Sequence, residues 1–154
     1  MKIFGFSTSV IIGIICAWLI SEISFHNYFI NILIPLLVSS FVASFLISKD
    51  AFPPNFLLKF PIIKKWNVDS ASERRGASGM FSSCIFIFLK TTFTFLTNLS
   101  AFGNNSIYLI GLYIFSVFVF IFMGIMFGAV VGSAGSFARD LFEKKLINKG
   151  KTSP

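Results

Sequence analysis

The stretch that decides the fold is residues 107–137, IYLIGLYIFSVFVFIFMGIMFGAVVGSAGSF, which contains no charged side chain. A helix of this length exceeds the hydrocarbon core of a bilayer, which is about 30 Å thick. Three further apolar stretches, at 3–20, 28–48 and 80–99, are also long enough to cross it. The sequence therefore predicts an all-α integral membrane protein with four transmembrane helices in a single membrane domain, residues 1–154.

The composition of the chain is that of a protein built for lipid. Hydrophobic residues make up 55%, the mean hydropathy is +0.84, and charged residues make up only 12%, about half the share in soluble domains. The net charge of +7 is compatible with nucleic-acid binding, but such binders cluster lysine and arginine on one soluble face. Here these residues lie between and after apolar stretches, so we expect no direct nucleic-acid contact.

The basic residues predict the orientation of the helices. Of the 13 lysines and arginines, all but Lys90 lie before the first stretch, in the segment 49–79, or in the tail 138–154. The loops 21–27 and 100–106 contain none. The positive-inside rule therefore predicts a multi-pass protein of the bacterial inner (cytoplasmic) membrane, with the N and C termini both cytoplasmic.

Two of the helices are expected to begin or end outside the bilayer. Ser70 and Glu73 have the spacing of a capping box, which places the start of the third helix ahead of Arg74. The helical pattern of the fourth stretch continues through 139–145 to a stop near Gly150. We therefore predict a long fourth helix that extends into the cytoplasm, followed by a basic tail.

The cytoplasmic segments form a candidate contact surface. Residues 52–66 are too broken by proline to span and too apolar for a solvated linker, so we expect an interfacial loop, with a simple tether as the alternative. Its basic residues suit anionic lipid headgroups or a cytosolic partner protein. The candidate residues of this surface are Lys59, Lys64, Lys65, Trp66, Arg74, Arg75, Arg139, Lys144 and Lys145.

Small residues recur every four positions on two of the helices. Such stripes let two helix backbones approach closely, because packing drives helix association in lipid. One stripe can seat a neighbour within the subunit while the other meets a second subunit, so we predict a homo-oligomer. The stripes comprise Gly124, Gly128, Gly132 and Ser136 in the fourth helix, and Gly5, Ser9, Gly13 and Ala17 in the first.

Lys90 is the one charged residue inside a predicted span. A lysine near the centre of the bilayer costs about 3 kcal/mol, so it needs a polar partner or water. We expect no carboxylate at its depth, because Glu22 follows the outer end of the first helix. One interpretation is a hydrated path or gate, and the other is a lysine that snorkels and fixes helix packing. The polar residues expected near its depth are Thr94, Asn31, Tyr113 and Ser116.

Signs of catalysis are absent from the pattern. The chain has one histidine, His26, in an expected loop, and no serine elbow, phosphate loop or metal-ligand set. We therefore predict a protein that is not an enzyme and needs no cofactor or metal. Cys16 and Cys84 lie at different expected depths, so both are predicted to be free, buried thiols.

Three functions fit these features. The leading hypothesis is an inner-membrane subunit that homo-oligomerises and anchors or signals to a cytosolic partner, as a membrane sensor in a defence-type (antiviral) system. The second is a small oligomeric channel that uses the Lys90 seam. The third is an immunity or exclusion protein that acts in the bilayer. In architecture alone, the plan resembles immunity proteins to pore-forming bacteriocins and membrane subunits of anti-phage systems.

Overall fold

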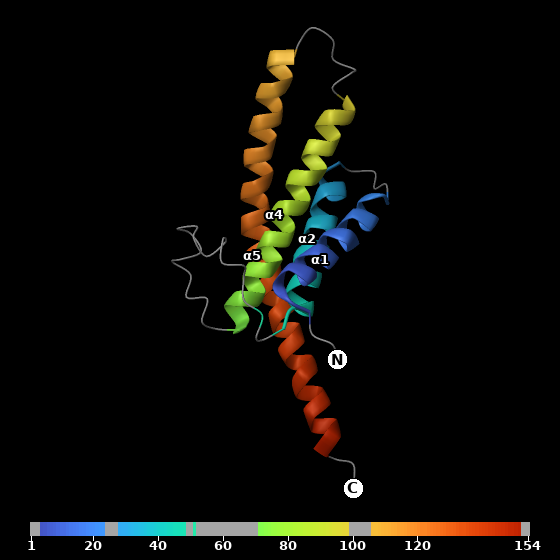
Figure 1. The fold of residues 1–154 in the computed structure, drawn as a ribbon, viewed down its shortest axis with the longest axis vertical. Coiled ribbons are helices and arrows are strands. Elements are labelled where there is room, and N and C mark those ends of the chain that lie inside the picture. Colours follow the sequence, from blue (N-terminus) through green and yellow to red (C-terminus); the bar gives the residue numbers. More distant parts are fainter. Residues whose placement is uncertain (1–3, 24–27, 49–50, 52–70, 99–105, 152–154) are drawn as a thin grey trace.

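The described part of the chain forms four helices that run alternately up and down (Figure 1). The structure, a computed structural model, describes residues 4–23, 28–48, 51, 71–98 and 106–151. The described helices are α1 (Phe6–Ser21), α2 (Tyr28–Leu46), α4 (Ala71–Asn98) and α5 (Ser106–Lys151). Within these residues, the prediction of an all-helical protein with four helices is confirmed.

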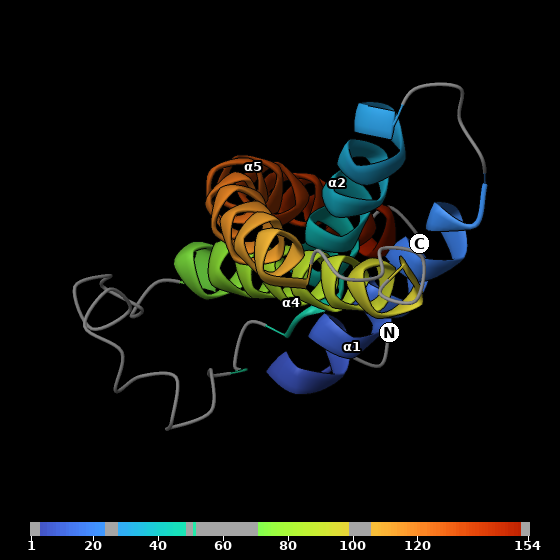
Figure 2. The same ribbon diagram turned by 90° about the horizontal axis from the view of Figure 1, so that it is seen from above.

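The centre of the bundle is occupied by α2 and α4. Each of them packs against all three other helices, whereas α1 and α5 pack mainly on α2 and α4. In Figure 2, which looks down the bundle, α4 lies between α1 and α5. Serines and alanines allow this close approach, because their short side chains leave room for the neighbouring backbone. Fully buried examples are Ser39, Ser40 and Ala43 in α2, and Ser78 and Ser82 in α4.

The two helical hairpins differ in length. α4 and α5 have 28 and 46 residues and are long and apolar enough to cross a membrane. α1 and α2 are also apolar, but they have only 16 and 19 residues. The first hairpin therefore covers only part of the length of the second, and its position along α4 determines which side chains can meet.

α4 begins earlier than the span predicted at 80–99. It starts at Ala71, ahead of Arg74, as the capping-box spacing predicts, so the loop predicted at 49–79 is replaced by helix from Ala71 onward. These first turns are buried, with Ala77 only 1% exposed. Ala77 packs with Phe6, Val10 and Ile47 in the apolar core.

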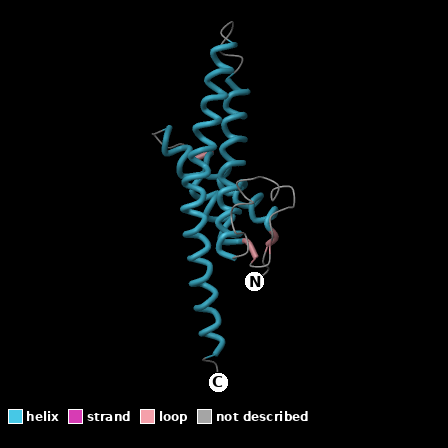
Figure 3. Tube along the Cα trace, turned by 90° about the vertical axis from the view of Figure 1, so that its left-hand side faces the viewer, coloured by secondary structure: helices cyan, strands magenta, loops and turns pink. Residues whose placement is uncertain are grey.

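The ends of the other helices fix the base of the bundle. α5 continues to Lys151, so the predicted fourth helix of about 107–150 is matched almost to the residue. Its C-terminal part runs beyond the other described helices (Figure 3). Near the start of the chain, Phe4 pairs with Ile47, and the Ser48 amide donates a hydrogen bond to the Phe4 carbonyl at 2.9 Å. Cys16 and Cys84 are both free and half-buried.

Candidate functional site

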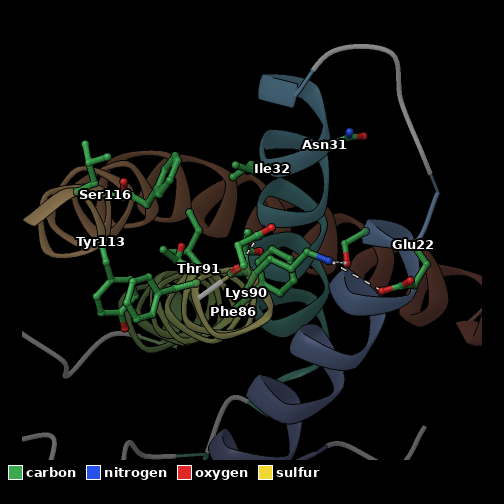
Figure 4. A pocket seen from close by; sticks show the side chains of 15 residues that line it. Glu22, Asn31, Ile32, Phe86, Lys90, Thr91, Tyr113 and Ser116 are labelled. Carbon is green, nitrogen blue, oxygen red and sulfur yellow. Dashed lines mark hydrogen bonds and ion pairs between the residues drawn. The ribbon is translucent and has the colours of Figure 1, made fainter. Parts of the chain in front are cut away.

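A cavity of about 590 Å³ lies at the end of the bundle where α1 ends and α2 begins. Residues of all four described helices line it (Figure 4). Its wall includes every polar residue that the sequence places near the depth of Lys90. These lining residues are Lys90, Thr94, Asn31, Tyr113 and Ser116. The fold thus brings together five residues from three helices that are far apart in the sequence.

The polar and cation–π contacts of Lys90 within the described residues are with side chains at the end of α1. Its Nζ donates a hydrogen bond to Ser21 Oγ at 3.1 Å and lies 3.9 Å from Glu22 Oε1. It also lies 5.2 Å from the centre of the Trp18 ring, within cation–π range. The expectation that no carboxylate lies at this depth is wrong. α1 is short and packs along the N-terminal part of α4. The C-terminal end of α1 therefore lies beside Lys90 and does not reach the C-terminal end of α4.

Hydrogen-bonded serines fill the bundle next to this cavity. Ser82 Oγ donates to the Val10 carbonyl at 3.2 Å and shares a 2.6 Å hydrogen bond with Ser39 Oγ. Since a hydroxyl has one proton, Ser39 is the donor in that shared bond. Ser40 Oγ donates to the Gly128 carbonyl at 2.7 Å. These bonds, here named the serine layer, connect α1, α2, α4 and α5.

The small-residue stripe of α5 packs inside the subunit. A Cβ atom on Gly132 would lie 2.9 Å from the Gly76 carbonyl oxygen, and one on Gly128 would lie 3.0 Å from Met80 Cα. A Cβ atom on Gly124 would lie 3.3 Å from Cys84 Sγ. Ser136 is 1% exposed. The stripe therefore serves the contact of α5 with α4 and α2, and a contact between copies through it would require α5 to leave the bundle.

The stripe of α1 is also turned inward. A Cβ atom on Gly13 would lie 2.6 Å from the Ser39 carbonyl oxygen. Ser9 and Ala17 are fully buried, while Gly5 is exposed with open space around it. Both predicted stripes are thus helix-packing surfaces within one chain. The predicted homo-oligomer would have to use other faces.

A cluster of charged side chains lies at the opposite end of the bundle, where α5 leaves it. Arg75 of α4, only 1% exposed, donates from Nη1 to Asp140 Oδ1 at 2.6 Å, and its Nη2 lies 3.7 Å from Glu143 Oε1. Arg139 donates from Nε to Glu143 at 2.8 Å and from Nη1 to the Phe45 carbonyl of α2 at 3.1 Å. We name Arg75, Arg139, Asp140 and Glu143 the arginine clasp.

The clasp corrects part of the predicted contact surface. Arg74, Arg75 and Arg139 were expected to face a partner or lipid headgroups, but all three are buried. The charge of Arg75 is paired inside the bundle because Asp140 and Glu143 of α5 lie opposite the start of α4, and Arg139 pairs with Glu143 of its own helix. Lys144 and Lys145 of the same surface are exposed. Its remaining members lie outside the described residues: Lys59, Lys64, Lys65 and Trp66.

Two features of the site escaped prediction from the sequence. Asp140 and Glu143 have the spacing of solvated surface pairs, and only the tertiary structure places Arg75 against them. The serine layer carried a usable signal, because the neighbouring serines Ser39-Ser40 and Ser82-Ser83 interrupt apolar helices. Paired small polar residues in such helices are typical of interhelical hydrogen bonding.

The described residues hold no group of three or more histidine, cysteine, aspartate or glutamate side chains that could bind a metal ion. No family model matches this chain, and no curated protein or solved structure is significantly similar to it. The functional proposal below therefore depends on the cavity, the serine layer, the clasp and the exposed end of α5.

Proposed function

We propose that the chain is a non-enzymatic, four-span protein of a bacterial inner membrane that anchors a cytosolic partner protein. In this proposal both termini are cytoplasmic, and the end of α5 projects toward the partner. The anchor can also signal, because movement of the bound partner would act on the helix that forms part of the bundle. The defence-type role and the immunity role stay predictions.

The exposed surface of α5 supports the membrane part of this proposal. Phe115, Phe118 and Phe122 have between 64% and 72% of their side chains exposed. At spacings of three and four residues, they share one side of the helix. A soluble monomer rarely exposes a continuous apolar patch of this kind, whereas lipid tails stabilise it.

The arginine clasp is the observation that carries the anchoring role. It ties α5 to α4 through Arg75 and to α2 through Arg139, at the point where α5 leaves the bundle. The helix then continues to Lys151 without a break. A force on the projecting end would therefore reach α2 and α4 directly. The exposed residues Lys144 and Lys145 give the projecting end a basic surface that suits an acidic partner.

The serine layer makes a pore through one subunit the weaker candidate. Among the described helices, the hydrogen bonds of Ser39, Ser40 and Ser82 join the four backbones next to the Lys90 cavity. A Cβ atom on Gly13 would already collide with Ser82 and Ser39, so there is little free space at this level. Conduction would require these close contacts to separate.

The topology is tested by labelling introduced cysteines in a variant without Cys16 and Cys84. Lys144→Cys in the projecting end should react with a membrane-impermeant maleimide only after the cells are permeabilised. Asn104→Cys, in the segment of the sequence between α4 and α5, should react in intact cells. Labelling of both residues in intact cells, or of neither, would contradict the four-span arrangement with cytoplasmic termini.

The anchoring role is tested by purification in mild detergent. We expect a soluble protein to copurify in stoichiometric amount and to be lost with Lys144→Glu/Lys145→Glu. The matched control is Lys144→Arg/Lys145→Arg, which keeps both charges and should keep the partner. A charge reversal at Arg75 would be a poor test, because it would disturb the buried clasp. If the unmodified protein purifies without a partner, and the charge-reversal variant has the same melting temperature as the unmodified protein, the result would count against an anchor.

A further inference from the structure

The cavity beside Lys90 has the chemistry of a ligand site that the anchoring role does not use. We propose that it binds one amphiphile that carries an acyl chain and an anionic head, with the head at Lys90. The two available head groups in a membrane are the phosphate of a phospholipid and the carboxylate of a free fatty acid. The same lysine can bind either one.

Lys90 is only partly satisfied by its own chain. Its ammonium group has three donors, and the structure gives one hydrogen bond, to Ser21 Oγ at 3.1 Å. Glu22 is 3.9 Å away, which is too long for a hydrogen bond, and its side chain is 67% exposed. Figure 4 shows Lys90 directed from α4 toward this end of α1. An incoming anion could therefore approach the ammonium group by displacing an exposed, loosely held carboxylate.

The rest of the cavity suits a hydrocarbon chain. Apolar side chains from α4 and α5 form much of its wall, including Phe86, Phe95, Leu112 and Phe120. Thr91 and Asn31 add polar groups near the expected head. A volume of about 590 Å³ falls within the range of cavities that hold small organic ligands, roughly 300–1,000 Å³. One cation in a cavity whose lining is mostly apolar matches a molecule with one anionic end.

Substitution of Glu22 distinguishes a ligand site from an ion pair that only stabilises the fold. If the pair only held α1 to α4, Lys90→Gln and Glu22→Gln would act in the same direction, because both break the ion pair, and Lys90→Gln would have the larger effect because it also alters the contacts with Ser21 and Trp18. In a ligand site the two variants act in opposite directions. Lys90→Gln removes the cation that binds the head, whereas Glu22→Gln removes the carboxylate that competes with it.

The experiment is native mass spectrometry of the full-length protein released from detergent with added lipid. The probes are phosphatidylglycerol, phosphatidylcholine of the same acyl chains, and oleate. We expect one equivalent of phosphatidylglycerol or oleate to be retained in preference to phosphatidylcholine. Lys90→Gln should weaken this binding by about tenfold or more, the usual worth of a hydrogen bond to a charged group. Glu22→Gln should strengthen it.

Fluorescence of Trp18 tests the location of the bound lipid independently. In a Trp66→Phe protein, Trp18 is the remaining tryptophan, and it lies beside Lys90. Phosphatidylglycerol with brominated acyl chains should quench it at lower concentration than brominated phosphatidylcholine.

In the mass-spectrometry experiment, retention of phosphatidylglycerol alone, or of oleate alone, would support the site and identify its head group. Equal retention of all three probes, or weaker binding in both Lys90→Gln and Glu22→Gln, would overturn the proposal. If Lys90→Gln does not fold, Glu22→Gln still decides between the two roles.

Discussion

Gly79 in α4 lies at a close approach of three helices, α2, α4 and α5. A Cβ atom there would lie 2.7 Å from Ser40 Oγ, 2.8 Å from the Ser40 carbonyl oxygen and 2.9 Å from Gly132 Cα. Two of these atoms belong to the backbone and cannot move away cheaply. We expect Gly79→Ala to destabilise the protein by about 1–3 kcal/mol through overpacking.

The matched control for Gly79 is Gly111→Ala in α5. Gly111 has open space around its Cβ position, so alanine there adds helix propensity without a collision. We expect a neutral or slightly raised melting temperature in detergent for Gly111→Ala, and a clear fall for Gly79→Ala. Equal melting temperatures for both variants would contradict the close packing of α2, α4 and α5.

Arg75 gives a second prediction for a single residue. Asp140→Ala leaves a guanidinium that is 1% exposed without its nearest carboxylate and with only Glu143, 3.7 Å from Nη2, beside it. A buried charge that loses a partner costs up to about 3 kcal/mol. Arg75→Met instead removes the buried charge, while Asp140 itself remains 46% exposed to solvent. We therefore expect Asp140→Ala to lower the melting temperature more than Arg75→Met. The reverse order would show that the clasp does not depend on the buried charge.

Arg139 acts on a whole element, because it caps the end of α2. The last carbonyls of a helix have no partner within the helix, and the Phe45 carbonyl accepts a hydrogen bond from Arg139 Nη1 at 3.1 Å. The positive charge also lies at the favourable end of the helix dipole, which is typically worth 0.3–1 kcal/mol. The Arg139 guanidinium lies 5.7 Å from the centre of the Phe45 ring. The end of α2 is therefore held by a side chain of α5.

Removal of this cap should loosen α2 locally. In Arg139→Ala we expect faster amide hydrogen exchange in the last turn of α2 and no change in the middle of that helix. Lys144→Ala removes a positive charge from the same helix at an exposed position, so it should leave α2 unchanged. Uniformly faster exchange along α2 in Arg139→Ala would point to general unfolding instead of a lost cap.

For the whole molecule, the inward position of the glycine stripes changes what their substitution should do. A Cβ atom on Gly128 would lie 3.0–3.2 Å from atoms of Met80 and Ser83 in α4. We expect Gly128→Leu to lower the melting temperature of the subunit without changing its oligomeric state in light scattering. If the wild-type protein is an oligomer and Gly128→Leu is a stable, folded monomer, the stripe would instead belong to a contact between subunits.

Much of the architecture could be predicted from residue patterns. The apolar stretches predicted four helices, the Ser70–Glu73 spacing predicted an early start for α4, and the continued helical pattern predicted the long α5. The list of polar residues near Lys90 also matched residues that line one cavity. All these inferences depend on local properties, namely helix period, capping and depth along one helix.

The partners of charged side chains could not be predicted in the same way. Counting residues along each span placed Glu22 beyond the reach of Lys90, and it left Arg74, Arg75 and Arg139 on the surface. The result for Glu22 assumed that the first helix spans the same two levels as the third. The structure violates this assumption, because α1 has 16 residues and lies against only part of the 28-residue α4.

The sequence by itself determined that the described part of the chain is helical and where its four helices lie, because those properties follow from hydropathy and helical period. It predicted four helices long enough to cross a membrane, whereas the described part of the structure has two of that length and hydropathy, α4 and α5. Only the tertiary structure decided how far each helix is shifted along its neighbours. That shift depends on close contacts between small residues of different helices, such as Gly13 with Ser39 and Gly132 with Gly76. It places Glu22 beside Lys90 and Asp140 against Arg75, and thereby forms both the cavity and the clasp.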